Sequence, residues 1–205
     1  MQDYDTILEA AEDEFVEKRS RFICAIAPVT TPEEAMAFIS ARREEHYDAR
    51  HTVYAYILKD GVCRYSDDGE PQGTGGQPAL EVLKRSGLVD VCVAVTRYFG
   101  GILLGAGGLV RAYSHSAVLA INEAEVVVYE PYCEYCLVCG YSEYQKYSNI
   151  LGIEKAVIDS TDFGAEVTVR FAVKKTQAER ILAKISESGF GRDVPQLCGE
   201  RFDCR

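Results

Sequence analysis

The chain has 205 residues, of which 47% are hydrophobic, and a formal net charge of −10. This charge argues against a nucleic-acid-binding surface that covers the whole protein, because phosphate contacts need clustered Lys and Arg. The sequence has no run of eighteen apolar residues, and its acidic N-terminus lacks the layout of a signal peptide. We therefore expect a cytoplasmic protein without a membrane partner, whose eight cysteines are reduced and mostly packed as small hydrophobic side chains.

The first part of the chain predicts strands that alternate with helices. A strand at residues 21–26 is expected to have a hairpin partner at residues 6–10. Thr31, followed by a proline and two acidic residues, predicts an N-cap and a helix to about Glu45. The alternating residues 51–58 predict the first strand of a further hairpin.

Two glycine-rich connections follow this second hairpin. The first is an acidic loop at residues 66–77, after which a helix is expected to begin at Pro78 and end at Gly87. The second connects an apolar strand at residues 90–96 with a helix at residues 109–122.

The remainder of the chain predicts a βαββαβ arrangement. Strands are expected at residues 132–139, 153–159 and 165–173, with a last short strand near Val194. Capping boxes at Ser142 and Thr176 predict two helices, which end at Gly152 and near Gly189. This order is that of a ferredoxin-like domain. We therefore expect an α+β protein with one domain at residues 1–130 and a second at residues 131–205.

The second connection is a candidate anion site, because it joins a strand to the positive pole of a helix whose first N–H groups have no intrahelical partner. Arg97 leaves the strand, and Arg111 lies in the first turn of the helix. Residues 84–122 contain four basic residues and one acidic residue, so this window carries a charge of +3 in a chain of −10. The alternative, which can hold at the same time, is that the glycines let the helix pack closely on the sheet. The glycines are Gly100, Gly101, Gly105, Gly107 and Gly108.

The acidic loop offers a second candidate site. Asp67, Asp68 and Glu70 lie within four positions, and His51 and Tyr65 belong to the neighbouring strands. Carboxylates at this spacing can hold Mg²⁺ or act as an acid and base pair. The alternative is that Asp and Gly at the exit of a hairpin form a turn or contact a partner.

Two patterns in the second half of the chain have a functional and a core interpretation. Cys133, Cys136 and Cys139 have the spacing of iron–sulfur ligands, but alternate residues of a strand face opposite sides, which favours packing. A group of tyrosines could stack RNA bases on a ferredoxin-like sheet or belong to its core. These are Tyr132, Tyr135, Tyr141, Tyr144 and Tyr147.

The sequence resembles the YigZ/IMPACT family in three long motifs, at residues 65–74, 95–101 and 104–113, and the resemblance is strong from Ser20 to about Ala124. It implies a first domain with the fold of a small-subunit ribosomal protein and of domain IV of elongation factor G. The second domain is implied to be similar to the last domain of elongation factor G. Eukaryotic IMPACT proteins act in translational control. The family often has a cysteine where this chain has Val53, so a cysteine nucleophile is not expected there.

These observations predict a translation-associated regulatory protein that binds RNA, the ribosome or a translation factor. We assign the phosphate contacts to Arg97, Arg111 and the five glycines, and partner or substrate contacts to the acidic-loop residues Asp67, Asp68 and Glu70 with His51, Tyr65 and Tyr98. No catalytic residue, metal or cofactor is assigned. Two alternatives stay open: a Mg²⁺-dependent enzyme acting on a small phosphorylated molecule or nucleotide, and a protein-binding regulator without nucleic-acid contact.

Overall fold

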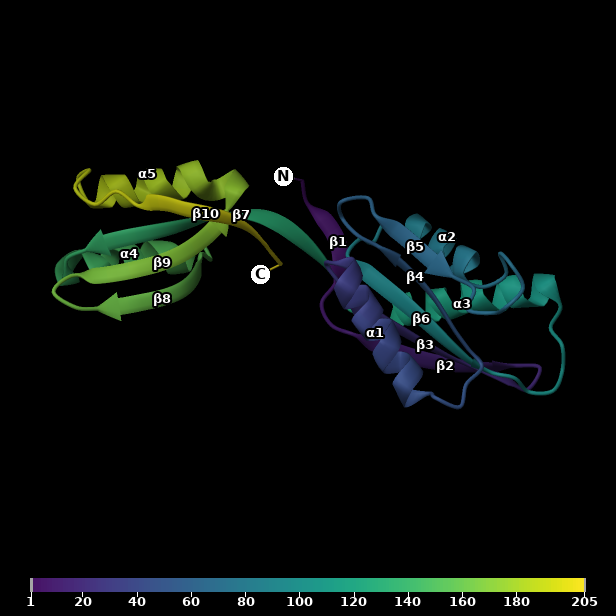
Figure 1. Ribbon diagram of the computed structural model, residues 1–205. Helices are drawn as coiled ribbons and strands as arrows, with labels where there is room; N and C mark the ends of the chain where they lie inside the picture. Colours follow the sequence, from purple (N-terminus) through teal and green to yellow (C-terminus); the bar gives the residue numbers. More distant parts are fainter. Residues whose placement is uncertain (1, 205) are drawn as a thin grey trace. The chain divides into compact units, whose positions relative to one another are not determined.

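The computed structural model describes residues 2–204, which form two compact units (Figure 1). One unit spans Tyr4–Val128, and the other contains the chain from Tyr129 onward. Both combine helices with an antiparallel sheet, so the predicted α+β class is confirmed. Within residues 2–204, no helix has the length and apolar character that spanning a membrane requires.

The N-terminal unit is built on a five-stranded sheet with the order β2-β3-β6-β4-β5. Its central strand β6 pairs antiparallel with β3 on one side and β4 on the other. Strand β1 lies outside this sheet and pairs with β7. The strands of the sheet are β2 (Ala11–Glu17), β3 (Ser20–Pro28), β4 (His51–Ile57), β5 (Cys63–Ser66) and β6 (Val91–Tyr98); β1 is Tyr4–Ile7 and β7 is Val126–Cys139.

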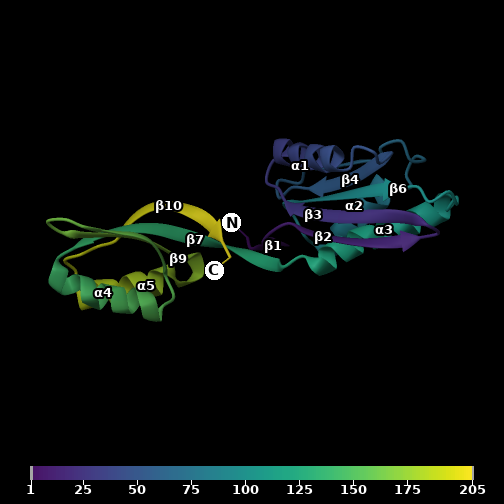
Figure 2. The ribbon, with the colours of Figure 1, turned by 90° about the horizontal axis from the view of Figure 1, so that it is seen from below.

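Helices cover both faces of this sheet. Helix α1 (Pro32–Glu45) lies on one face and α3 (Ala106–Glu123) on the other, as Figure 2 shows. Helix α2 (Gly76–Ser86) packs beside α3. The core under α1 includes Ile39 and Tyr56, and the core under α2 and α3 includes Phe22 and Tyr113. A sheet buried on both faces explains the uninterrupted apolar run of β6.

The N-cap of α1 forms as the sequence predicts. The Thr31 hydroxyl accepts a hydrogen bond from the Glu34 N–H at 3.1 Å, and Pro32 opens the helix. The Glu34 carboxylate in turn accepts the Thr30 N–H and hydroxyl, and these contacts lower the pKa of Glu34. The first turn of α1 is therefore fixed by side chains next to it in sequence.

The C-terminal unit has the ferredoxin-like order. Its strands are arranged β10-β7-β9-β8, and both of its α-helices lie on one face of the sheet (Figure 2). The core between them includes Tyr147 of α4 and Phe171 of β9. The elements are α4 (Tyr141–Ile153), β8 (Val157–Phe163), β9 (Val167–Lys174), a 3-10 turn (Lys175–Gln177), α5 (Ala178–Ser188) and β10 (Gln196–Asp203).

The hairpin predicted at residues 6–10 is wrong. The partner of β3 is β2, an acidic edge strand, and the two residues that connect them, Lys18 and Arg19, have φ angles of 46° and 66°. Such a turn normally carries Asn-Gly or Gly-Gly, so the sequence gives no hairpin signal here. The charges of β2 are compatible with a strand because an edge strand keeps one side in solvent.

Both capping boxes predicted for the C-terminal unit are also wrong. Helix α4 begins after Gly140 and α5 after Gln177, and neither helix has a side-chain cap. The Ser142 hydroxyl instead donates to the neighbouring Glu143 carboxylate. The helices form because they bury Tyr147, Leu151, Ile181 and Ile185 against the sheet, which stabilises them more than a cap does.

The core interpretation holds for the cysteine pattern and for three of the tyrosines. Cys133 and Cys139 are buried and Cys136 is only partly so, as expected for alternating faces of a strand. Tyr132, Tyr135 and Tyr147 are buried too. These three tyrosines are therefore not available to stack RNA bases.

Candidate functional site

A hollow of about 360 Å³ opens in the N-terminal unit where β4 and β6 meet the start of α3. One wall is polar, and the other is apolar. Four of the lining residues, His51, Glu70, Arg97 and Gly105, are predicted site residues. The polar wall is formed by Arg50, His51, Glu70 and Arg97, and the apolar wall by Pro71, Phe99, Leu103, Leu104 and Leu109; Gly105 and Ala106 close the hollow at the helix start.

Strand pairing brings the two central polar residues together. His51 at the start of β4 lies directly opposite Arg97 near the end of β6. Residues opposite each other in an antiparallel pair have Cβ atoms about 5 Å apart on the same face. Both side chains therefore reach the hollow, although 46 positions separate them in the sequence.

Arg97 forms a buried ion pair with Glu70. The Arg97 Nη1 lies 2.5 Å from the Glu70 Oε1, and the two side chains are 7% and 4% exposed. The Tyr113 hydroxyl donates to the same Glu70 oxygen at 2.8 Å, and burial together with the Glu70 charge raises the pKa of Tyr113. The Arg97 Nε is buried without a hydrogen-bond partner among residues 2–204. The charge of Arg97 is thus compensated inside the protein, so this side chain is not the freely available phosphate ligand that the sequence predicts.

The His51 ring has a defined orientation. Its Nδ1 lies 2.7 Å from the Asp68 carbonyl oxygen, and because a carbonyl only accepts, Nδ1 carries the hydrogen. In the neutral ring Nε2 is then an acceptor. A Cβ at Gly69, where φ is +86°, would stand 3.4 Å from the ring. The acidic loop therefore orients His51 through the Asp68 carbonyl, with Gly69 next to the ring.

The acidic-loop carboxylates organise the backbone. Asp67 accepts the N–H groups of Gly73, Gly75 and Gly76 at 2.8 to 2.9 Å, which fixes the loop against the start of α2. Asp68 accepts the Thr52 N–H at 2.7 Å and pairs with Arg43. Within residues 2–204, no group of three or more His, Cys, Asp or Glu side chains is placed to hold a metal ion. Both aspartates have the turn-forming role that the sequence analysis gave as the alternative.

The five predicted glycines do not form one site. Gly100 is required because a Cβ there would lie 2.0 Å from the Arg19 backbone, and its N–H donates to Ser20 Oγ. Helix α3 begins at Ala106, earlier than predicted, after Gly105 with a φ of 71°. The Leu109 N–H already donates to the Gly105 carbonyl. The backbone donors left at the helix start are those of Ala106, Gly107 and Gly108.

Arg111 lies in a neighbouring hollow of about 280 Å³ with Lys18, Gly108 and His115. Leu104 lines both hollows, so Arg97 and Arg111 lie in adjacent hollows rather than in one. Tyr98 donates to the Asp48 carboxylate at 2.9 Å, and Tyr65 is exposed on β5.

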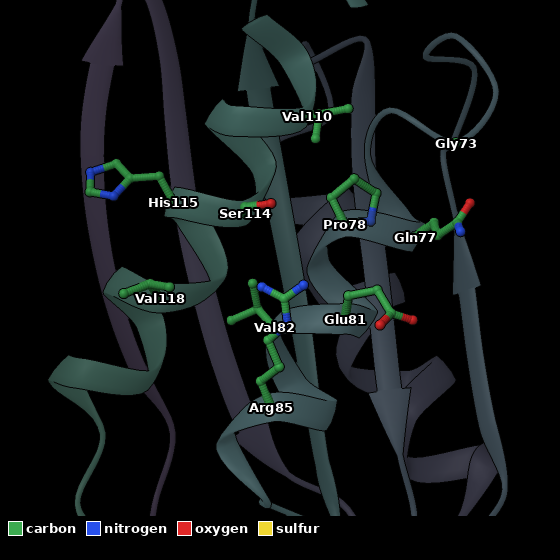
Figure 3. Close-up of a pocket in the computed structure, with 10 residues that line it drawn as sticks. All are labelled: Gly73, Gln77, Pro78, Glu81, Val82, Arg85, Val110, Ser114, His115 and Val118. Carbon is green, nitrogen blue, oxygen red and sulfur yellow. The ribbon is translucent and has the colours of Figure 1, made fainter. Parts of the chain in front are cut away.

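A groove of about 500 Å³ runs between α2 and α3 (Figure 3). Ser114 points toward α2, whereas the His115 ring lies against Phe15 of β2. Glu81 and Arg85 of α2 carry opposite charges. The polar groups of this groove do not converge, and none of its ten lining residues is a predicted site residue.

Sequence reasoning missed seven of the eleven residues that line the first hollow, among them Arg50, Phe99 and Leu103. Arg50 is exposed and immediately precedes His51, and Phe99 and Leu103 are 47% and 82% exposed. The sequence does contain a signal for this surface, because two large apolar side chains inside a glycine-rich connection are not expected to lie in a core.

Both units match known domain families. Residues 18–121 match the Impact N-terminal domain, and residues 137–192 match a domain of unknown function, DUF1949. The chain is 37% identical to the IMPACT family member YigZ of Escherichia coli over 184 residues, which covers 88% of this chain and 89% of the relative. This chain belongs to the IMPACT family.

This chain covers a smaller share of two further relatives. The IMPACT family member YvyE of Bacillus subtilis is 48% identical over 129 residues, which is 62% of this chain and 59% of the relative. The Protein IMPACT of Oryctolagus cuniculus is 33% identical over 43% of this chain and 30% of its own length. A solved structure described as a crystal structure of a hypothetical protein matches with a TM-score of 0.64 and 32% identity, covering 97% of this chain and 98% of the other.

Proposed function

We propose that this protein is a translation-associated regulator that binds RNA, as part of the ribosome or free, through the surface around the start of α3. One observation carries the proposal. The first turn of this 18-residue helix contains no acidic residue and no side-chain cap, and its start opens into a hollow beside an exposed arginine. Free N–H groups and the positive helix pole favour phosphate there.

Two exposed arginines supply the cationic contacts. Arg50 lines the hollow at the helix start, and Arg111 lines the adjacent hollow on the other side of Leu104. Within residues 2–204, neither has an ion pair to an acidic side chain. Their positions support phosphate contacts on both sides of the start of α3, in a chain that is otherwise strongly acidic.

Family membership supports the biological setting. The resemblance to the IMPACT family implies translational control, and residues 18–121 match the Impact N-terminal domain. The Mg²⁺-dependent enzyme alternative gains no support from this site, because the Asp67 and Asp68 carboxylates on which it depends accept backbone N–H groups. No feature of the site favours the regulator without nucleic-acid contact.

The test is co-sedimentation with ribosomes and with purified RNA at about 50 mM and about 200 mM salt. The variant is Arg50→Ala/Arg111→Ala, which leaves the buried Arg97–Glu70 pair intact. The matched control is Arg64→Ala/Arg170→Ala, which removes the same charge from two exposed strand positions outside the hollows.

We expect the natural protein and the control to pellet in a salt-sensitive manner and the Arg50/Arg111 variant to stay in solution. Equal pelleting of both variants would overturn the assignment of this surface. Absence of pelleting by the natural protein in either condition would overturn the proposed function.

A further inference from the structure

We propose that the hollow at the start of α3 binds a terminal nucleoside monophosphate, either as a free mononucleotide or as the 5′-phosphorylated end of an RNA. This inference deepens the proposed function and rests on it. The phosphate would lie on the N–H groups of Ala106 and Gly107 next to Arg50, with the ribose toward His51 and the base against Phe99 and Leu103.

A buried donor supports the phosphate position independently of the helix. Arg97 lines the hollow, its side chain is 7% exposed, and its Nε has no hydrogen-bond partner among residues 2–204. A buried unpaired donor is unfavourable. Because Arg97 lines the hollow, an oxygen acceptor that reached its Nε from there would satisfy it. The helix start and the residue that carries this unpaired donor therefore line the same hollow.

The charges around the hollow fit a single phosphate. The Glu70 carboxylate at 2.5 Å cancels the charge of Arg97, so the cationic contributions that remain are Arg50 and the helix pole, about half a charge. A phosphomonoester carries about −1.5 to −2 charges at neutral pH, and a diester inside an RNA chain carries one. Arg50 and the helix pole together favour a terminal phosphate over a longer phosphate track.

The remaining walls fit a nucleoside. The His51 Nε2 is an acceptor in the neutral ring and can take a ribose hydroxyl hydrogen. The Arg97 guanidinium carbon lies 5.6 Å from the centroid of the Phe99 ring, which holds this half-exposed ring at the hollow. Aromatic faces of this kind stack bases without sequence preference. A volume of about 360 Å³ lies in the range of small-ligand pockets, about 300 to 1,000 Å³.

The test measures binding of a short single-stranded RNA by fluorescence anisotropy, with a 5′-phosphate or a 5′-hydroxyl and the label at the 3′ end. AMP and UMP serve as competitors, and adenosine is the control without phosphate. The variants are Arg50→Ala for the phosphate contact and Leu103→Ala for the base contact; both residues are exposed, so both variants should fold. Arg64→Ala is the matched charge control.

We expect the 5′-phosphate to improve affinity by at least about tenfold, AMP and UMP to compete, and adenosine not to compete. The slope of log affinity against log salt should be shallow, about −0.7 to −1.4, because one or two phosphates are neutralised. Arg50→Ala should abolish the 5′-phosphate preference, whereas Arg64→Ala should retain it.

RNA binding without a 5′-phosphate preference and without competition by AMP or UMP would overturn this inference and leave the proposed function standing. Binding of mononucleotides that depends on Arg50, with no binding of RNA or ribosomes, would support the inference and overturn the proposed function. If neither mononucleotide nor RNA binds, both are wrong.

Discussion

The two units of this protein differ in how deeply they bury their polar residues. Within residues 2–204, every buried polar or charged residue belongs to the N-terminal unit, between Thr6 and Ser116. In the C-terminal unit the ion pairs keep at least one partner partly exposed: Arg201, which is 28% exposed, contacts Asp159 at 2.8 Å and Glu134 at 3.0 Å. The Glu154 side chain is 6% exposed, but its partners Arg180 and Lys184 are exposed by 58% and 48%. The first sheet is covered by helices on both faces and the second on one.

This difference shows that the costly buried charges lie in the N-terminal unit. A sheet with one open face can place ion pairs in solvent at little cost. Between two covered faces, a charged pair loses its hydration and is compensated only by close partners. The N-terminal unit nevertheless contains Glu70 and Arg97 at the edge of its hollow. Violations of simple packing of this kind are expected at functional sites.

The largest effect expected is that of breaking the buried pair. Arg97→Ala leaves the Glu70 carboxylate buried without its cation, which should lower the free energy of unfolding by about 3 to 5 kcal/mol. Hydrogen exchange of the β6 amides measures this loss in the N-terminal unit. Arg201→Ala is the matched change in the other unit and should cost about 1 kcal/mol or less. Equal losses would contradict the contrast between the units.

The next effect concerns Asp67, which holds three N–H groups at the start of α2. Asp67→Ala should lower the free energy of unfolding by about 2 kcal/mol, the upper end for a lost cap. Ser142→Ala is the counterpart in the C-terminal unit and should change it by less than about 0.5 kcal/mol, because Ser142 contacts only its neighbour Glu143. Urea denaturation followed by circular dichroism compares the two variants.

Alkaline pH should weaken the N-terminal unit through its buried thiols. Burial raises the pKa of Cys24 and of Cys92 to about 12 each, above the ordinary value of about 8.5. Between these values the unfolded chain loses the protons and the folded chain keeps them, so stability falls as pH rises. Each thiol contributes a loss of about 1.4 kcal/mol per pH unit.

Melting temperatures measured between pH 8 and 11 should fall accordingly. At pH 8 a thiol reagent should label the exposed Cys63 and Cys198 quickly and the two buried thiols slowly. Labelling of Cys24 and Cys92 at the rate of Cys63 would show that the N-terminal core is more open than the structure indicates.

The smallest effect is a gain of stability in the C-terminal unit. Gly152 lies inside α4, and a Cβ there would meet no heavy atom within 4 Å. Gly152→Ala should therefore raise the free energy of unfolding by about 0.5 to 1 kcal/mol. Gly87→Ala should instead lower it, because Gly87 ends α2 with a φ of 76°. Thermal unfolding of both variants tests the opposite signs.

Sequence reasoning succeeded where neighbouring residues determine the structure. Thr31 and Pro32 define the start of α1, Gly87 the end of α2, and the periodic segments of the second half its ferredoxin-like order. It failed at Lys18 and Arg19, whose turn lacks glycine.

The site itself depends on distant pairs, which a single sequence does not reveal. Arg97 and Glu70 are 27 positions apart, and nothing near either residue indicates that their charges meet. From the sequence alone Arg97 is therefore predicted to be a free phosphate ligand, whereas the structure pairs it with Glu70. The glycines are adjacent in the chain, which predicts one site, but Gly100 is needed for the close approach of the β2–β3 turn.

The buried pair also limits how this chain can vary. Replacing Glu70 alone leaves a buried cation unpaired, and replacing Arg97 alone leaves a buried anion unpaired. Either single substitution therefore gives a less stable protein. We therefore expect the residues at positions 70 and 97 to vary together. Tyr113 donates to the same Glu70 oxygen, so position 113 should vary with them. Sequences that diverge from this one should change these positions together or retain all three.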